Sequence, residues 1–416
     1  MSSVDRRQFL FRASAGVGLT AGLGWSINQN QEQQRQEHAV EGIRQGTRPY
    51  EGPNVILVRF GGGVRRQETI LDPTNTYCPF IYHELAGRHG ILFSNMEIED
   101  QPGVATSHGE GTLYLLTGQY RDFQDVSGRL FGSRFEPEKP TLFEYLRSQY
   151  NIPSYQALIV NGEDRIDEEF YTFSNNRYHN YGIRYKATVL SLYRFRMYLL
   201  RERLKNRNLS DQEERQLTRQ LQQMEQIDHR GSNRNLNQAQ DAELKQFWRN
   251  WRDYYGSSGF TCPRGDRLLT TLAIRAINEL RPKLMMINYQ DPDYVHWGNT
   301  TFYTRGISII DEGVRELYNT VQNDEEYRDN TVFVIVPDCG RDNNRLMSVP
   351  YQHHFNTPGS HQIFAIIAGP ERWVPRSAQG LGQSRKVQQI SVTKTIGEIM
   401  GFNAEHAEAD SLYRLA

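Results

Sequence analysis

The sequence predicts an α/β fold: a doubly wound, mostly parallel sheet with helices on both faces and a helical insertion. First, it contains short, largely apolar runs that are typical of buried parallel strands. Second, amphipathic helical patterns separate these runs, so strands and helices alternate. Third, a length of 416 residues suits a large α/β domain that carries an insertion. The predicted strands are 54–60, 157–160, 284–289, 331–336 and 363–368.

Local signals justify the elements in chain order. The run 54–60 is bounded by Pro53 and by a glycine triplet, which indicates a strand that ends in a tight loop. A helix over 112–118 is predicted to stop at Gly118. Proline in the first turn favours a helix over 140–147. Apolar residues spaced by three and four positions predict a further helix over 307–321.

The segment of about 185–255 differs in composition from the rest of the chain. Its parts 201–226 and 238–255 are rich in Arg, Gln, Glu and Leu and contain no glycine. We therefore predict a helical insertion in the α/β domain. Its charges are typical of a solvated helical face, and the alternative is a contact surface for an envelope protein partner.

Overall charge excludes one class of partner. Lys and Arg number 48 and Asp and Glu number 49, so a strongly basic nucleic-acid binder is not expected. The three cysteines are Cys78, Cys262 and Cys339, and no pair has the CxxC spacing. Neither a disulfide framework nor a zinc knuckle is predicted.

The N-terminus resembles a twin-arginine export signal. Arg6 and Arg7 precede Phe9 and Leu10, and a weakly apolar run rich in Gly and Ala follows. The alternative is a frayed basic terminus. We expect residues 1–47 to be a signal and polar tether, either cleaved or kept as a membrane tether, and residues 48–416 to be the α/β domain. The expected location is the periplasm or the cell envelope.

The loop after the strand 284–289 carries Asp291, Asp293 and His296. Ligands of open α/β sheets bind beyond the carboxyl ends of the strands. The spacing of Asp293 and His296 lets a carboxylate and an imidazole converge on one divalent metal ion. Alternatively, Asp293 caps the following turn and His296 packs beside Trp297.

The strand 331–336 leads into Asp338, Cys339 and Arg341. A carboxylate at this position must be solvated, paired or bound to metal. Arg341 either pairs with Asp338 or holds an oxygen of an anionic substrate. Cys339 is either a thiolate ligand or a small buried apolar residue.

A loop before the last strand carries His353, His354 and His361. We expect at least one of them to face the site, although spacing does not select which. A hydroxyl near the start of the helix over 112–118, on Thr106 or Ser107, is a candidate nucleophile. The alternative is that one of these residues is the N-cap of that helix.

Taken in order, these features resemble the alkaline phosphatase superfamily, which includes sulfatases, phosphodiesterases and cofactor-independent phosphoglycerate mutases. The closest resemblance is to a twin-arginine-exported bacterial branch of unknown function that is grouped with sulfatases. The residues that carry the resemblance are Phe60–Gly63, Glu68–Pro73, His108 with Thr117 and Gly118, Asp293 with His296, Pro337–Arg341, His353 with His354, and the helix-like end 387–401.

The resemblance implies a metal-dependent site and also exposes departures from it. Where the superfamily has a metal-binding aspartate after its first strand, this chain has Phe60 or Gly61. The usual Asp-His pair is Asp338-Cys339. Ungapped counting from Gly118 places His108 at the nucleophile position, whereas Thr106 or Ser107 requires a short slip. One of the two metal positions is therefore predicted to be incomplete.

Two hypotheses follow. The leading one is an exported, metal-dependent hydrolase-like protein that acts on a phosphate or sulfate ester, with a partly degraded two-metal site. Its expected cofactor is a divalent ion such as zinc, manganese or calcium, and its partner is an anionic ester substrate. The second is a non-catalytic binding or assembly protein of the cell envelope. The expected metal ligands are Asp293, His296, Asp338, His354 and His361, and the expected catalytic residues are Thr106, Ser107, His108 and Arg341.

Overall fold

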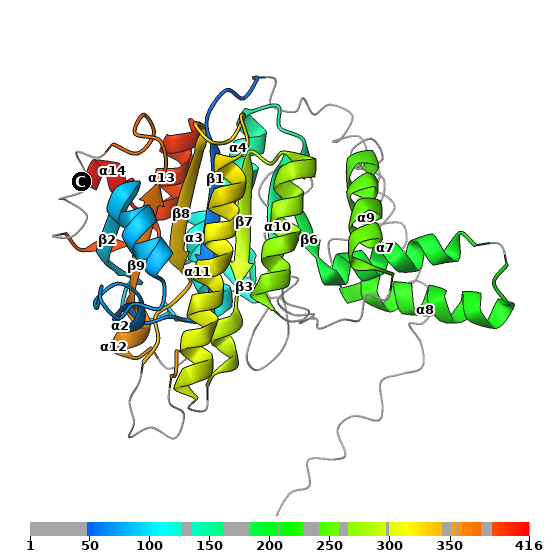
Figure 1. The fold of residues 1–416 in the computed structure, drawn as a ribbon, viewed down its shortest axis with the longest axis horizontal. Coiled ribbons are helices and arrows are strands. Elements are labelled where there is room, and N and C mark those ends of the chain that lie inside the picture. The colour runs from blue at the N-terminus through cyan, green and yellow to red at the C-terminus, as the bar shows by residue number, and fades with distance from the viewer. Residues whose placement is uncertain are drawn as a thin grey trace, which may run out of the picture. The chain divides into compact units, whose positions relative to one another are not determined.

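An eight-stranded sheet with the order β10-β2-β9-β8-β1-β7-β5-β6 forms the centre of the domain (Figure 1). β9 pairs antiparallel with β8 and β2, and the other pairings are parallel. The predicted fold class is therefore confirmed, with one reversed strand. The bounds are β1 (Asn54–Phe60), β2 (Gly90–Glu97), β5 (Ala157–Asn161), β6 (Thr188–Ser191), β7 (Leu284–Tyr289), β8 (Thr331–Pro337), β9 (Gln362–Ala368) and β10 (Val387–Gln388).

The computed structural model describes residues 48–125, 135–161, 184–206, 208–227, 241–257, 265–296, 299–342, 351–353, 356–375 and 385–415. The predicted export signal and tether, residues 1–47, lie outside these ranges. Residues 46–416 form one unit by their internal contacts. A separate two-stranded sheet joins β3 (Phe123–Asp125) and β4 (Phe135–Pro137).

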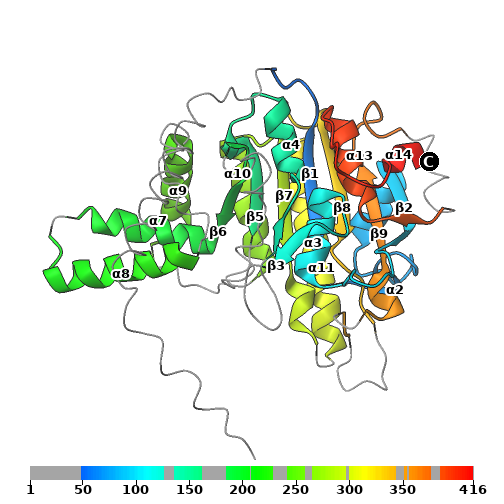
Figure 2. The same ribbon diagram turned by 180° about the vertical axis from the view of Figure 1, so that it is seen from behind.

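Helices cover both faces of the central sheet. One face packs against α10 (Asp266–Leu280), α11 (Thr300–Gln322) and the π-helix η1 (Phe80–Ala86), as Figure 1 shows for the first two. The other face packs against α3 (His108–Thr117), α4 (Leu142–Gln149) and α13 (Ser391–Met400), seen in Figure 2. Alternation along β1 sends Val55 and Leu57 to the second face and Ile56 and Val58 to the first.

The segment predicted as an insertion contains β6 and three helices, α7 (Leu192–Leu204), α8 (Asp211–Ile227) and α9 (Asp241–Tyr255). Both ribbon views place these helices beyond the β6 edge of the sheet. Phe195 and Trp251 are buried and join α7 and α9 to the core, while α8 is largely exposed. None of the described helices is both long and apolar enough to span a bilayer.

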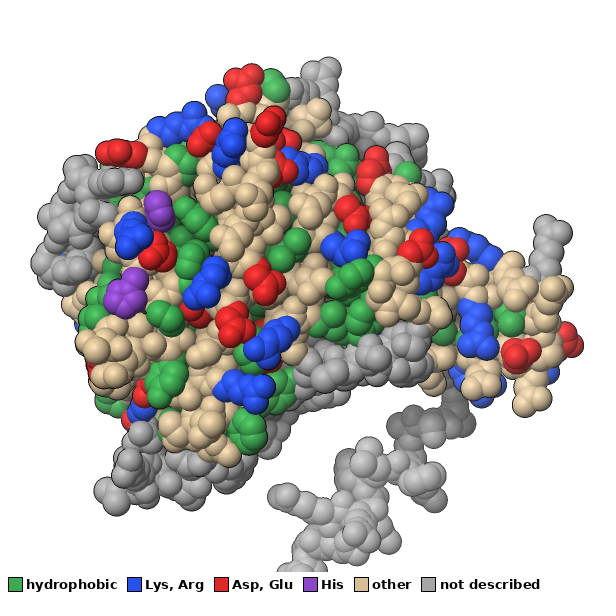
Figure 3. Space-filling view, viewed as in Figure 1, with side chains coloured by type: hydrophobic (Ala, Val, Ile, Leu, Met, Phe, Trp, Pro, Cys, Tyr) green, Lys and Arg blue, Asp and Glu red, His purple; other side chains and the backbone are tan. Residues whose placement is uncertain are grey.

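Shorter elements complete the fold. They are α2 (Arg66–Thr69), η2 (Ser154–Gln156), η3 (Asp291–Tyr294), α12 (Pro358–His361) and α14 (Leu412–Leu415). On the face shown in Figure 3, acidic and basic side chains are intermixed, in line with the balanced composition.

The sequence did not predict β2, and it placed the start of α3 too late. β2 includes Ser94 and Asn95 within its apolar residues, so it lacks the continuous apolar run of a central strand. The first turn of α3 holds His108 and two glycines, which are weak helix formers. Ser107 nevertheless caps α3, because its side chain accepts a hydrogen bond from the backbone N–H of Glu110.

Candidate functional site

The candidate site lies where β1, β7 and β8 end at one edge of the sheet. η3 follows β7 and carries Asp293, and Asp338 follows β8 directly. The first turn of α3 comes close to β8, since a Cβ added at Gly111 would lie 2.0 Å from the carbonyl oxygen of Asp338. The loop after β1 comes equally close to η3. Gly62 has a φ of +86°, and a Cβ there would lie 2.5 Å from the backbone nitrogen of Asp293.

His108, the first residue of α3, bridges the two carboxylates. Its Nδ1 lies 2.7 Å from Oδ2 of Asp338, and its Nε2 lies 2.8 Å from Oδ1 of Asp293. A carboxylate oxygen only accepts hydrogen bonds, so both ring nitrogens must donate, which only the imidazolium form does. The side chain is buried, with 8% of its surface exposed.

The surroundings of His108 favour its charged form. Burial alone would lower the pKa of His108, but the negative charges of Asp293 and Asp338 outweigh burial and hold this pKa well above its ordinary value. His108 therefore acts in this cluster as a cation shared by two carboxylates.

Asp338 is fully surrounded by donors from the protein itself. Oδ2 accepts from His108 and lies 3.2 Å from Nη1 of Arg59. Oδ1 accepts from the backbone N–H of Cys339 at 2.8 Å and of Gly63 at 3.3 Å. Burial raises the pKa of Asp338, but the charges of His108 and Arg59 more than offset it, and the pKa is lowered to about 2.

Arg59 is the site residue that the sequence analysis missed. It lies in the middle strand β1, is wholly buried, and donates from Nη1 to Thr112 Oγ1 at 2.8 Å in addition to its contact with Asp338. The sequence does indicate this role, because Arg59 is a single arginine within the apolar run of β1. A buried cation in a central strand requires a buried acidic partner.

Asp293 is the centre of a second group of contacts. Its Oδ1 lies 2.9 Å from Nε2 of His296, 3.3 Å from Nε2 of His353 and 3.6 Å from Nη2 of Arg341. Burial raises the pKa of Asp293, but His108 and the other histidines outweigh this effect and keep the pKa well below its usual range. Donors from four separate segments of the chain, including His108 of α3, thus surround one carboxylate oxygen.

Of the late histidines, the structure places His353 at Asp293. His354 lies outside the described residues. His361 points elsewhere: its Nδ1 donates to the carbonyl oxygen of Ile98 at 3.0 Å, and its Nε2 lies 3.8 Å from Asp100.

Two overlapping groups of side chains in the described part of the chain could hold a metal ion. Asp293, His296 and His353 offer ligand atoms close to one another. Neighbouring ligand atoms of a tetrahedral zinc ion, bound at about 2.0–2.1 Å, lie roughly 3.3 Å apart. The distances from Oδ1 of Asp293 to Nε2 of His296 and of His353 match this value within a few tenths of an ångström. A second group of possible ligand atoms, on His108, Cys339 and His353, shares His353 with the first.

The predicted hydroxyls make structural contacts. Thr106 is wholly buried and donates from Oγ1 to the carbonyl oxygen of His353 at 2.5 Å. Ser107 is the N-cap of α3, and its hydroxyl also donates to Oε2 of Glu110 at 2.6 Å. His108, rather than either hydroxyl, is the residue that contacts both carboxylates.

Arg341 and Cys339 are also buried in the cluster. Arg341 donates from Nη1 to the carbonyl oxygen of Val295 at 2.5 Å and from Nη2 to that of Gly62. These bonds tie the loops after β1 and β7 together. Burial raises the pKa of Cys339 to about 11, so its thiol is a poor source of thiolate. Its Sγ lies 3.9 Å from Nδ1 of His108.

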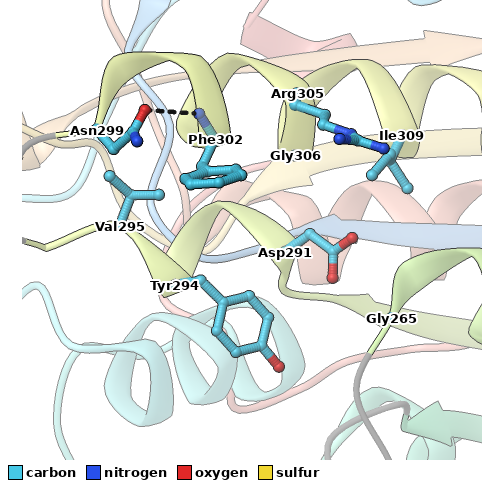
Figure 4. A pocket seen from close by; sticks show the side chains of 9 residues that line it. All are labelled: Gly265, Asp291, Tyr294, Val295, Asn299, Phe302, Arg305, Gly306 and Ile309. Atoms are coloured by element: carbon cyan, nitrogen blue, oxygen red, sulfur yellow. Dashed lines mark hydrogen bonds between the residues drawn. The ribbon is translucent and has the colours of Figure 1, made fainter. Parts of the chain in front are cut away.

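A pocket of about 470 Å³ lies beside the same turn (Figure 4). Asp291 lines it, whereas Asp293 belongs to the charged cluster. The rings of Tyr294 and Phe302 also line it, and they are 42% and 59% exposed. Residues of η3 that are close in sequence thus lie in different surroundings: Asp293 in the buried polar cluster and Asp291 at the open pocket with its aromatic rings.

Comparison with known proteins gives a likeness of fold. No protein-family model matches the chain, and none of the curated proteins matches it. Solved structures that resemble it include a protein in the alkaline phosphatase superfamily from Vibrio parahaemolyticus, with 11% identity and a TM-score of 0.47 over 89% of this chain and 72% of that one.

Two further solved structures also resemble the chain. The C-terminal periplasmic domain of a phosphoethanolamine transferase from Campylobacter jejuni has 9% identity and a TM-score of 0.48 over 86% of this chain and 92% of that chain. A putative sulfatase from Bacteroides thetaiotaomicron has 12% identity and a TM-score of 0.49 over 86% and 74%. One of these solved structures is of a protein in the superfamily that the sequence resembles. The likeness concerns the fold, and it carries no argument about individual residues.

Proposed function

We propose that this domain is an alkaline phosphatase-like fold that works by binding rather than by ester hydrolysis, as a binding or assembly protein of the cell envelope. The observation that carries the proposal is the bridge of His108 between Asp293 and Asp338, at 2.8 and 2.7 Å. In this arrangement a side chain of the protein holds together the two carboxylates that two metal ions would otherwise share.

Charge supports the same interpretation. The carboxylates of Asp293 and Asp338 face the cations of Arg59, Arg341 and His108. The cluster is buried, so each additional positive charge is costly there. Binding of a divalent ion in this cluster would become favourable only after His108 had lost its proton.

The pocket beside η3 provides a place for a ligand. Its volume lies in the range of about 300–1,000 Å³ that is usual for small-molecule sites. Exposed aromatic side chains such as Tyr294 and Phe302 often mark recognition surfaces. The helical insertion over about 185–255 is the proposed surface for a protein partner.

A second candidate is the metal-dependent hydrolase of a phosphate or sulfate ester. The specific observation in its favour is the set of Asp293, His296 and His353, which fits one ion. A bound zinc, manganese or calcium ion would supply Lewis acidity for an anionic ester substrate. Arg341 contacts Asp293 from the side of Gly62 and would hold this carboxylate in place.

Zinc titration of the purified protein and of a His108→Ala variant distinguishes these candidates. If His108 takes the place of a metal, its removal frees both carboxylates, and zinc should bind the variant at least about tenfold more tightly than the wild type, a difference of roughly 1.4 kcal/mol. His361→Ala is the matched control, because this buried histidine lies outside both carboxylate contacts.

The opposite outcome favours the hydrolase. In that case the wild type as purified carries close to one equivalent of metal, and His296→Ala removes it. Hydrolysis of a generic aryl phosphate or aryl sulfate would then be expected from the wild type and not from His296→Ala.

We also propose export by the twin-arginine route, which rests on the sequence of residues 1–47. Replacing Arg6 and Arg7 by lysine should retain the protein in the cytoplasm, and cell fractionation with immunoblotting measures this. Unchanged envelope localisation of the double variant would refute the proposal.

A further inference from the structure

Buried polar residues form a row across four neighbouring strands at the carboxyl edge of the sheet. Arg59 of β1 is in register with Asn288 of β7, which is in register with Asn161 of β5, which pairs with Ser191 of β6. Residues in register on parallel strands point to the same face. All four are buried, with at most 1% of their surface exposed.

Arg59 uses only one side of its guanidinium for the contacts in the candidate site. Nη1 contacts Asp338 and Thr112. Nε and Nη2 are buried and have no hydrogen-bond partner. These two nitrogens form the edge of the guanidinium that donates two parallel hydrogen bonds to a pair of oxygens. The edge remains cationic at all ordinary pH values.

Unpartnered amide groups accompany this edge on the neighbouring strand. Both side-chain atoms of Asn288, Oδ1 and Nδ2, are buried without a hydrogen-bond partner, and so is Oε1 of Gln290, two residues further along. The nearby buried carboxyl of Asp266 accepts from the backbone N–H groups of Gln290 and Asp291. Donors and acceptors without partners therefore gather between β1 and β7.

Gly61 shows on which side of β1 the guanidinium lies. A Cβ added at Gly61 would lie 3.0 Å from Nη2 and 3.2 Å from Cζ of Arg59, and 2.1 Å from the carbonyl oxygen of Tyr289 in β7. The free edge of Arg59 therefore lies at the boundary of β1 with β7, the strand of Asn288, whereas Nη1 contacts Asp338 after β8.

Buried polar groups without partners cost free energy, about 1–3 kcal/mol each and more when they are charged. Leu57 and Met286 occupy the preceding positions on the same face, so apolar residues pack well there. A guanidinium edge and an amide that remain in such surroundings need a ligand with at least two acceptor oxygens.

We propose that the buried side chains of Arg59 and Asn288, on one face of the neighbouring strands β1 and β7, bind a small oxyanion with two oxygens on one centre. Nε and Nη2 of Arg59 would donate to the two oxygens, and Nδ2 of Asn288 would add a third hydrogen bond. A hydroxyl of a protonated oxyanion, or a water molecule, would donate to Oδ1 of Asn288. This site shares Arg59 with the carboxylate cluster but uses the opposite edge of its guanidinium, and it does not depend on whether the cluster binds metal.

The test measures the melting temperature in sodium phosphate and in sodium acetate against sodium chloride of equal ionic strength. Native mass spectrometry of the purified protein detects an anion that is already bound. The variants are Arg59→Lys, which keeps the charge and loses Nε, and Asn288→Leu. Asn54→Leu is the matched control, because both amide atoms of Asn54 are also buried without partners but lie at the opposite end of β1.

At least one of the two anions should raise the melting temperature of the wild type and of Asn54→Leu by several degrees, or both proteins should carry an anion as purified. Arg59→Lys and Asn288→Leu should lose that response. An equal response of all four proteins would identify a general salt effect. Neither a shift nor a bound anion in the wild type would mean that ordered water satisfies these groups, and either outcome overturns the proposal.

Discussion

Replacing His108 by alanine should destabilise the domain by about 3 kcal/mol at neutral pH. Breaking a buried ion pair by removing one partner costs about 3–5 kcal/mol, because a buried charge is left without compensation. The lower end of this range applies to His108→Ala, because both carboxylates keep other donors. Asp338 keeps Arg59 and two backbone N–H donors, and Asp293 keeps two histidines and an arginine.

The assay is urea unfolding, with thermal unfolding as a second measurement. At about 2 °C for each kcal/mol in a domain of this size, the melting temperature should fall by roughly 6 °C. His361→Ala reports the cost of deleting another buried imidazole, one that donates to a backbone carbonyl instead of bridging carboxylates.

The pH dependence tests the charge of His108 separately. The folded-state pKa of His108 is raised above its ordinary value, so its contribution is fully present below about pH 6.5 and is lost as pH rises through the raised pKa. The wild type should therefore lose stability relative to His108→Ala as pH increases above 6.5. A cost below about 1 kcal/mol, or one that stays constant to high pH, would refute the assignment of His108 as a bridging cation.

Three further predictions concern the surroundings of the cluster. Gly111→Ala should lower the free energy of unfolding in urea by about 3 kcal/mol or more, because the added Cβ would lie 2.0 Å from the carbonyl oxygen of Asp338. Gly87→Ala is the control: its Cβ would have only a contact at 3.5 Å, and it should cost less than about 1 kcal/mol. Burial raises the pKa of Asp311 to about 6, so stability should fall by at most about 3 kcal/mol between pH 4 and 6, and Asp311→Asn should abolish this slope. EDTA should leave the melting temperature of the wild type unchanged; a fall of several degrees would indicate a structural metal.

The sequence predicted those strands whose residue pattern directly reflects how they are buried in the fold. β1, β7 and β8 are continuous apolar runs because both of their faces are covered, and their predicted bounds agree with the structure to within one residue. β2 was missed because it is only partly buried and its residues alternate less clearly. The antiparallel direction of β9 was also missed, since the apolar pattern of a strand contains no information on its direction.

The site was predictable in its carboxylates but not in its partners. Asp293 and Asp338 follow buried strands, and topology brings such positions together. The choice among the late histidines had no local signal, because a loop has no period that tells which of two adjacent residues faces inward. His108 was noted only as the residue at the nucleophile position. Its bridging role depends on three segments that meet only in the folded chain.

The contacts of His108, Arg59 and Arg341 join several loops at this edge of the sheet. Here His108 joins α3 to the loops after β7 and β8, and Arg59 joins β1 to Asp338. Arg341 joins the loops after β1 and β7 through Gly62 and Val295. Because these cations are part of the chain, the edge is assembled as the protein folds.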